Sequence, residues 1–324
     1  MNRPILCLTP VKNEEWILDR FIQCALLWAD KIVILDQGSE DRTPAIAKSY
    51  SDVIYEDIGE IEYNEGFFRK RLIETARKYS KNAILISIDA DEALSSRIFD
   101  GKVMDRICAL KEGTGFSFKL ANIDPSYDCY WEQLEPTIAG FVDDGDEYNA
   151  NWISTPRFPL IGKPILEIEE VKLLHFQYVD WHRMESKQRW YKVKEKINDS
   201  NASSIRIYRR YTHMYRAMKG QKPLDPLFFI KYEENGIDMR AFKKTTYWWD
   251  KKVIEMLKTQ KSLEEFKFLD VVPDGLVDDK RIDMIKRSGI GRAIRWYLKY
   301  TTQYYPAFPI RAIDKLLRIF IKYA

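Results

Sequence analysis

The sequence lacks the short motifs that mark several large enzyme classes. No GxGxxG follows its first apolar run and no GxxxxGK[ST] occurs, so we expect neither a dinucleotide-binding site nor a P-loop. No HExxH is present, and the three histidines, His175, His182 and His213, do not combine with the cysteines in a tetrahedral zinc pattern. The chemistry must therefore be sought among the carboxylates and the basic side chains.

Cysteine is scarce and long apolar runs are missing. Cys7, Cys24, Cys108 and Cys129 include no CxxC pair, which is typical of reduced thiols in a cytosolic protein. The sequence opens with no signal peptide, and no apolar stretch is long enough to span a bilayer. We expect a cytoplasmic protein, either free or peripheral on the inner face of a membrane.

The composition is that of a globular protein with a sizeable core. Of 324 residues, 45% are hydrophobic and 31% are charged. The formal net charge of +3 is too small to indicate a nucleic-acid partner, and we expect none. Aromatic residues make up 14%, which favours either carbohydrate-stacking surfaces or large core side chains.

Apolar runs alternate with helical patterns over the first 125 or so residues. This alternation predicts an α/β fold with a mostly parallel central sheet and helices on both faces. In such sheets ligands bind beyond the carboxyl ends of the strands, where Asn13, Asp36, Asp89 and Asp91 are expected. Asn13 is also the expected N-cap of the first helix. The pattern predicts strands at 5–9, 31–35, 53–57 and 83–88, and helices at 14–29, 43–49 and 66–79.

Three segments occur in order, each at the end of a predicted strand: TPVKNEEWIL (9–18), ILDQGSEDRT (34–43) and IDADE (88–92). Together they resemble the nucleotide-sugar half of a GT-A-fold glycosyltransferase, and they are most similar to the family 2 glycosyltransferases. A lone DxD carries little information, but three ordered elements over roughly residues 4–125 are a specific signal. The second segment matches the family's D-x-G-S-x-D-x-T pattern, and the third contains its DxD: Asp36, Gly38, Ser39, Asp41 and Thr43, then Asp89-Ala90-Asp91.

The resemblance implies a GT-A fold and a division of the chain. We expect residues 1–224 to form the catalytic domain, with 1–125 as the nucleotide-sugar half and 126–224 as the acceptor half. Residues 225–324 are expected to form a helical C-terminal extension.

The resemblance also implies a reaction. A metal-dependent, inverting, hexosyl-type transferase would move a sugar from a UDP- or GDP-sugar to a glycan or lipid-linked acceptor, in cell-surface polysaccharide synthesis. Mn²⁺ or Mg²⁺ would stabilise the charge on the departing diphosphate, usually with only one or two protein carboxylates as ligands. We expect Asp91 to be the direct ligand and Asp89 to lie nearer the ribose or a metal-bound water.

Further candidates follow from the same resemblance. Asp36 is placed to accept hydrogen bonds from base or ribose, and Thr9 and Glu14 border the same pocket. Arg69 and Arg71 could approach base or phosphate, or could belong to a solvated basic face. His175 resembles the histidine that completes the metal site in several GT-A enzymes, although a buried core histidine stays an alternative.

An inverting transferase also needs a carboxylate that takes the proton from the acceptor hydroxyl. Two acidic segments, 143–147 and 167–170, supply the candidates. We place Glu169 or Glu170 ahead of Asp144.

Two other functions stay open. A sugar-phosphate nucleotidyltransferase would need a Gly-rich basic loop after the first strand, which TPVKNEEW does not provide. A non-catalytic carbohydrate-binding or scaffold protein is disfavoured because the acidic residues of the third segment are intact.

The tail from Gly289 has its own pattern. It holds seven Arg and Lys residues, Lys322 the last of them, against one acid, Asp314, with aromatic residues at helical spacing between them. This composition suits peripheral contact of residues 289–324 with an anionic membrane. A helix packed on its own domain and a dimer contact are the alternatives.

Overall fold

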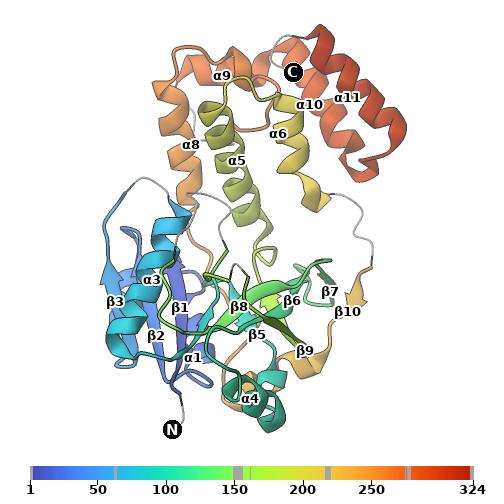
Figure 1. Cartoon of the computed structure of the whole chain (residues 1–324). Helices are drawn as coiled ribbons and strands as arrows, with labels where there is room; N and C mark the ends of the chain where they lie inside the picture. Colours follow the sequence, from blue (N-terminus) through green and yellow to red (C-terminus); the bar gives the residue numbers. More distant parts are fainter. Residues whose placement is uncertain are drawn as a thin grey trace. The chain divides into compact units, whose positions relative to one another are not determined.

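The computed structural model describes residues 3–61, 64–148, 156–160, 162–215, 220–273, 275 and 279–321. It divides into two compact units: Met1–Val179 with Gln221–Thr245, and Asp180–Gly220 with Thr246–Ala324 (Figure 1). The units do not follow the expected boundary at residue 224. Segment Gln221–Thr245 belongs to the first unit because it buries Tyr232 and Met239 in that unit's core. The functional division into catalytic domain and extension stays a prediction.

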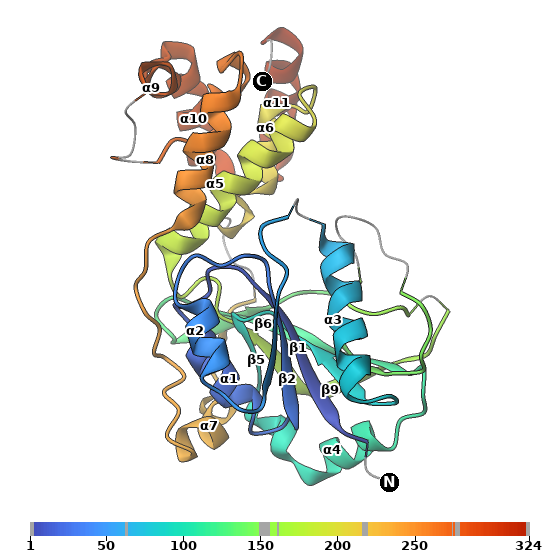
Figure 2. The ribbon, with the colours of Figure 1, turned by 90° about the vertical axis from the view of Figure 1, so that its left-hand side faces the viewer.

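The centre of the first unit is a parallel sheet in the order β4-β1-β2-β3. Side chains alternate along β1, so that Cys7 joins the core under the first helices while Leu6 and Leu8 join the core under α3. Figure 2 shows α1 and α2 on one face and α3 on the other. The bounds are β1 Ile5–Val11, α1 Leu18–Ala25, β2 Lys31–Asp36, α2 Thr43–Lys48, β3 Val53–Asp57, α3 Glu65–Tyr79 and β4 Ile84–Ser87.

The other half of the sheet is largely antiparallel. It continues from β4 as β8-β6-β7-β10, and β9 pairs in parallel with β6 and antiparallel with β5. The sheet is therefore mixed around a parallel core. The bounds are β5 Glu92–Leu94, η1 Ser96–Phe99, α4 Gly101–Cys108, β6 Gly115–Ile123, β7 Cys129–Glu132, β8 Thr137–Val142, β9 Ile165–His175, β10 Lys222–Pro223, η3 Pro226–Phe228 and α7 Ile230–Glu234.

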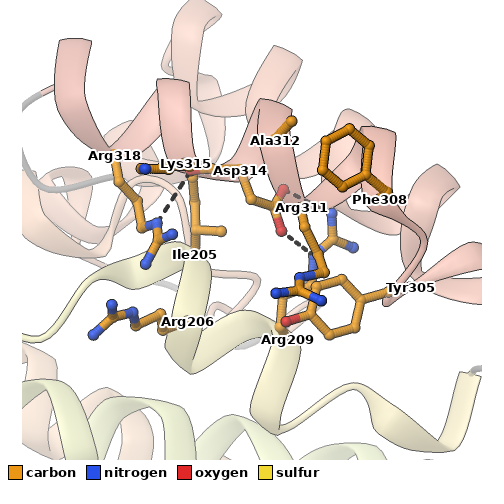
Figure 3. A pocket seen from close by; sticks show the side chains of 10 residues that line it. All are labelled: Ile205, Arg206, Arg209, Tyr305, Phe308, Arg311, Ala312, Asp314, Lys315 and Arg318. Atoms are coloured by element: carbon orange, nitrogen blue, oxygen red, sulfur yellow. Dashed lines mark hydrogen bonds and ion pairs between the residues drawn. The ribbon is translucent and has the colours of Figure 1, made fainter.

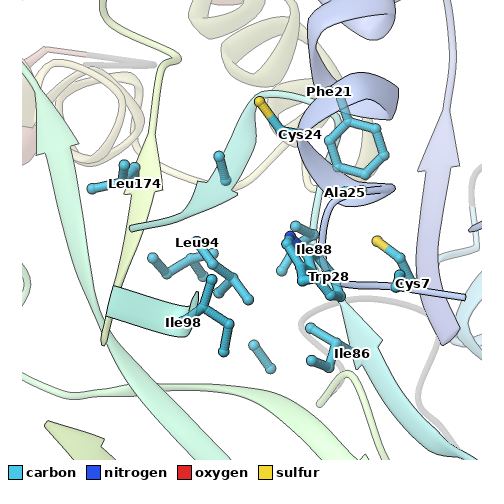
Figure 4. Close-up of a cluster of buried hydrophobic side chains, with 14 of the residues drawn as sticks. Cys7, Phe21, Cys24, Ala25, Trp28, Ile86, Ile88, Leu94, Ile98 and Leu174 are labelled. Atoms are coloured by element: carbon cyan, nitrogen blue, oxygen red, sulfur yellow. The ribbon is translucent and has the colours of Figure 1, made fainter. Parts of the chain in front are cut away.

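The core of the first unit fixes the strand that precedes the acidic segment. Figure 4 shows Phe21 and Trp28 with Ile86, Leu94 and Ile98, all of them buried. Cys24 lies in the same cluster, where burial raises the pKa of its thiol to about 12 against the opposing charge of Arg20. All four cysteines are free thiols, as their spacing predicted.

The expected cap of the first helix is wrong. The helix begins at Leu18 rather than at residue 14, and Ile17 precedes it without a side-chain cap. Asn13 instead has a φ of 55°, in the left-handed region that Asn tolerates better than most residues. It belongs to a loop that follows β1.

The second unit is helical and has a separate core. Its buried side chains include Val193, Ile205, Val253, Phe266 and Leu298. The expected α/β class with C-terminal helices is confirmed. Among the described residues, no helix combines the length and apolar character needed to cross a membrane. The bounds are α5 Trp181–Asn198, α6 Ser204–Arg210, η2 His213–Tyr215, α8 Trp248–Thr259, η4 Glu264–Phe266, α9 Lys280–Arg287, α10 Gly289–Thr301, η5 Thr302–Tyr304 and α11 Phe308–Phe320.

Candidate functional site

The loops that follow β1 and β2 are joined by side-chain hydrogen bonds. The backbone N–H of Asn13 donates to Ser39 Oγ at 2.8 Å, and the N–H of Glu40 donates to Asn13 Oδ1 at 2.8 Å. The N–H of Glu14 donates to Thr43 Oγ1 at 2.7 Å. Polar residues of the first two motifs therefore hold each other's loops at the carboxyl edge of the sheet.

Asp36 supports these loops from within. Its side chain is buried, and its two oxygens accept hydrogen bonds from the N–H of Ser39 and the hydroxyl of Tyr55, both at 2.8 Å. Burial and this bond to Asp36 raise the pKa of Tyr55. The predicted contact of Asp36 with base or ribose would have to share oxygens that the protein already uses.

Gly38 lies where a side chain would not fit. Its φ is 73°, and a Cβ there would lie 2.6 Å from the backbone nitrogen of Glu60. The glycine of the D-x-G-S pattern thus lets the β2 loop lie against the segment that follows β3.

Thr9 and Glu14 are less accessible than the sequence suggested. Thr9 is fully buried on β1, and its hydroxyl oxygen has no hydrogen-bond partner among the described residues. Glu14 Oε2 accepts a hydrogen bond from Trp16 Nε1 at 2.5 Å. Both residues lie beside the predicted site as structural members of its wall.

Asp89 is held by two arginines. Arg69 Nη2 donates to Asp89 Oδ1 at 3.1 Å, and Arg157 Nη2 lies 3.8 Å from Oδ2. Arg69 also donates to Ser87 Oγ at 3.1 Å, which ties α3 to the end of β4. The Asp89 side chain is still 42% exposed. Arg69 thus reaches the acidic segment as predicted, but it contacts a carboxylate there.

Beneath Asp89 lies a buried ion pair that sequence reasoning missed. Arg157 donates to the two oxygens of Glu92, each at 2.9 Å, and to the carbonyl of Ser87 at 2.7 Å. Burial would lower the pKa of Arg157, but the charges of Glu92 and Asp89 raise it, so the guanidinium stays charged. Glu92 also accepts from the N–H of Asp89 at 2.8 Å. Glu92 could have been noticed as the next acid in the DADE run, whereas Arg157 has no local signal.

Asp91 faces a different partner, His175. His175 Nε2 lies 3.6 Å from Asp91 Oδ2, and each side chain is only 14% exposed. The strand register explains the meeting, because β9 places His175 opposite Glu92 on β5 and opposite Asn122 on β6. His175 Nδ1 lies 2.9 Å from Asn122 Oδ1. A carbonyl oxygen only accepts, so a hydrogen on Nδ1 satisfies this contact and leaves a lone pair on Nε2. Because a carboxylate also only accepts, Nε2 and Asp91 Oδ2 in this tautomer do not hydrogen-bond to each other.

This pair fits a divalent cation. A carboxylate suits Mn²⁺ and Mg²⁺, whereas a neutral imidazole nitrogen favours a transition metal such as Mn²⁺ over Mg²⁺. His ligands in metal sites are oriented by a partner at the other ring nitrogen, as His175 is by Asn122. No group of three or more His, Cys, Asp or Glu side chains that could hold a metal occurs among the described residues. Phosphate oxygens and water would therefore complete the shell, which is usual for Mg²⁺.

The remaining sequence candidates lie elsewhere. Arg71 donates to Glu56 Oε1 at 2.6 Å and does not contact the acidic segment. Glu169 is exposed, and Glu170 pairs with Arg106 at 2.6 Å. They lie on β9 six and five residues before His175, or about 17–20 Å along the strand. The structure does not bring them to Asp91.

Asp144 is also unsuited to the role of base. Lys163 Nζ lies 2.5 Å from its Oδ2. Burial would raise the pKa of Asp144, but the ammonium of Lys163 and the backbone N–H of Asp146 outweigh it and lower that pKa. A carboxylate stabilised in this way is a weaker proton acceptor.

Comparison with known proteins gives a family match over the segment that carries this site. Residues 7–128 match the family model described as Glycosyl transferase family 2, and the match includes all three loops. A mycobacterial protein of solved structure is similar at 18% identity over 38% of this chain and 42% of its own, with a TM-score of 0.28. The structure of GalNAc-T7 with UDP, GalNAc and Mn²⁺ is similar at 12% identity over 60% of this chain and 51% of its own, with a TM-score of 0.37.

Staphylococcus aureus TarS 1–349 is similar at 13% identity over 93% of this chain and 90% of its own, with a TM-score of 0.34. The chain thus spans about half or less of the length of the first two structures. Residues 7–128, which include the strand-end loops with the three motifs, are thus the part of the chain that matches the Glycosyl transferase family 2 model.

Proposed function

We propose that the chain is a metal-dependent glycosyltransferase that uses a nucleotide-sugar donor, a UDP- or GDP-sugar. The observation that carries this proposal is the Asp91–His175 pair, at 3.6 Å, inside a segment that matches family 2 glycosyltransferases. Asp91 and His175 would hold Mn²⁺ or Mg²⁺. The ion supplies charge stabilisation for the diphosphate leaving group.

The chain's own residues divide the other tasks. Arg69 and Arg157 fix the position of Asp89, whose exposed edge can accept a hydrogen bond from a ribose hydroxyl. Glu92 holds Arg157 in place and fixes the backbone of Asp89, so it is a positioning residue. The interlocked loops after β1 and β2 would border the same site at the carboxyl edge of the sheet.

Several finer parts of the proposal rest on the resemblance alone. These are the hexosyl-type inverting course, the glycan or lipid-linked acceptor, and a role in cell-surface polysaccharide synthesis. Contact of residues 289–324 with an anionic membrane is also proposed, on the basic and aromatic composition of that tail. Lys322, one of the tail cations, lies outside the described residues.

Calorimetric titration with UDP and GDP, with and without Mn²⁺, tests the proposal. Asp91→Asn removes a charged ligand, so the Mn²⁺-dependent part of nucleotide affinity should fall at least tenfold, about 1.4 kcal/mol, with the circular dichroism spectrum unchanged. Glu170→Gln is the matched control, because it removes an exposed acid on β9 and should leave affinity unchanged. Equal affinity in Asp91→Asn and wild type, or nucleotide binding insensitive to Mn²⁺ and Mg²⁺, would overturn it.

A further inference from the structure

The second unit contains a cavity of about 570 Å³ that the glycosyl-transfer proposal does not use. It lies between α6 and α11, and Figure 3 shows basic side chains from both helices around it. Its lining residues are Ile205, Arg206, Arg209, Tyr305, Phe308, Arg311, Ala312, Asp314, Lys315 and Arg318.

The one acid of this lining is already neutralised. Asp314 is buried, and its two oxygens each lie 3.0 Å from a nitrogen of the buried Arg209. Tyr297 also donates to Asp314 at 2.8 Å. Arg209 in turn donates to the carbonyl of Leu298 and the hydroxyl of Thr301, so both charges are satisfied by the fold. This pair forms a fixed, neutral wall of the cavity.

The other basic residues keep their charge uncompensated. Arg206, Arg311 and Lys315 are exposed, and none has an ion-pair partner among the described residues. Arg318 donates only its Nε, to the backbone carbonyl of Asp314 at 3.2 Å. Four positive charges therefore converge on one concave site, which is the arrangement that recognises a phosphate group, because each guanidinium can donate two hydrogen bonds to it.

An exposed apolar stripe runs along α11 beside this cavity. The buried residues of the helix, Ile310 and Asp314, mark one face. At 100° per residue Leu316 and Ile319 fall on the opposite side, and Phe320 falls on the flank next to Leu316. These three side chains are 53%, 64% and 79% exposed, and Phe308 at the rim of the cavity is 81% exposed. Apolar side chains next to a cationic pocket match a bilayer surface, where acyl chains lie beside phosphate groups.

We propose that the cavity between α6 and α11 binds the phosphate group of a membrane lipid, with the exposed stripe of α11 lying in the interface. The lipid, rather than a free anion, is indicated because the apolar stripe adjoins the four cations. This inference rests on the proposed contact of residues 289–324 with an anionic membrane and names its lipid group, and Arg206 extends that site to α6. It does not depend on glycosyl transfer.

Flotation of the full chain with phosphatidylcholine vesicles tests the inference. Vesicles that contain phosphatidic acid should bind the protein, and vesicles given the same surface charge with oleate should bind it less, because a carboxylate offers fewer acceptors. In Arg311→Gln/Lys315→Gln, binding to phosphatidic acid should fall roughly 10- to 30-fold, from the loss of two interfacial cations. Both residues are exposed, so the fold should persist.

The matched control is Arg292→Gln/Lys299→Gln, which removes the same charge from exposed positions on α10 outside the cavity. It should bind clearly better than the pocket variant. Equal loss in both variants would mean unspecific surface attraction and would overturn the pocket. The proposal that the ligand is a membrane lipid would be overturned if no vesicles bind the protein. It would also be overturned if calorimetry shows inorganic phosphate in the pocket without vesicle binding.

Discussion

At the scale of single residues, the two aspartates of the DxD segment have different environments although they are two positions apart. Asp89 is compensated by Arg69 and Arg157, while Asp91 faces a histidine that carries no obligatory charge. The charge of Asp91 also contributes to the raised pKa of Arg157. The strand end therefore combines an acid held by two arginines with an acid that, in the proposal above, would hold a metal.

The orientation of His175 depends on Asn122, which is buried on β6. Asn122→Val keeps a strand-forming side chain but removes the acceptor for Nδ1–H. We expect Mn²⁺ affinity to fall about 10- to 100-fold, as for other groups that orient a metal-bound histidine. Electron paramagnetic resonance of free Mn²⁺ measures this directly. Asn122→Asp keeps an acceptor oxygen and should restore binding, whereas a purely structural role would not distinguish the two variants.

At the scale of elements, the loops after β1 and β2 are rigid because each satisfies the other's backbone. Ser39, Thr43 and Asn13 all bond across the two loops. In this chain, several polar residues of the family pattern therefore stabilise the loops at the site by hydrogen-bonding to the backbone of the neighbouring loop.

Gly38 and Gly59 allow the cost of a left-handed backbone to be separated from the cost of a steric clash. Both have positive φ, 73° and 67°, but only a Cβ at Gly38 would meet backbone atoms. Gly59→Ala should cost about 1–2 kcal/mol from the left-handed conformation alone. Gly38→Ala should cost clearly more, because the β2 loop must also move away from Glu60. Urea unfolding of the two variants compares them, and equal destabilisation would mean that the contact relaxes freely.

Strands and helices were predicted well where local pattern decides them. The apolar runs of β1 to β4 and the amphipathic pattern of α3 gave elements within a few residues of those observed. The predicted cap at Asn13 was wrong because the Asn13 side chain accepts a hydrogen bond from the loop after β2. That tertiary contact cannot be read from the local sequence. Asp91 and His175 lie 3.6 Å apart, and their role as metal ligands stays a prediction. Arg157, about 65 residues from Glu92, could not be found because only the fold brings them together.

At the scale of the whole molecule, a buried lysine, Lys192, lowers the stability of the second unit at neutral pH. Lys192 is buried on α5, where burial lowers its pKa from 10.5 to about 8 against the attraction of Asp270. Below about pH 8 Lys192 is protonated in both the folded and the unfolded chain, so the folded state carries the full free-energy cost of burying the charged ammonium. Between that pH and 10.5 the folded chain loses its proton first, so stability should rise with pH.

Lys192→Met should remove this dependence. Near pH 7 the variant should be more stable than the wild type by up to about 3 kcal/mol, and the difference should shrink toward about pH 9.5. Hydrogen exchange of α5 and α8 in urea follows the second unit specifically. A difference that stays constant with pH would show that Lys192 does not titrate in this range.

The order in which the chain visits its two units has a consequence for synthesis on the ribosome. The path enters the second unit at Asp180, returns to the first at Gln221 and leaves it again after Thr245. The nascent first unit lacks strand β10 and the buried Tyr232 until that return segment has emerged. Meanwhile α5 and α6 are already outside the exit tunnel with an unfilled core, since their partners α8 to α11 are translated last. During that interval the newborn chain exposes the core side chains of these helices, such as Val193 and Ile205, and we expect chaperones to bind it at that stage of elongation.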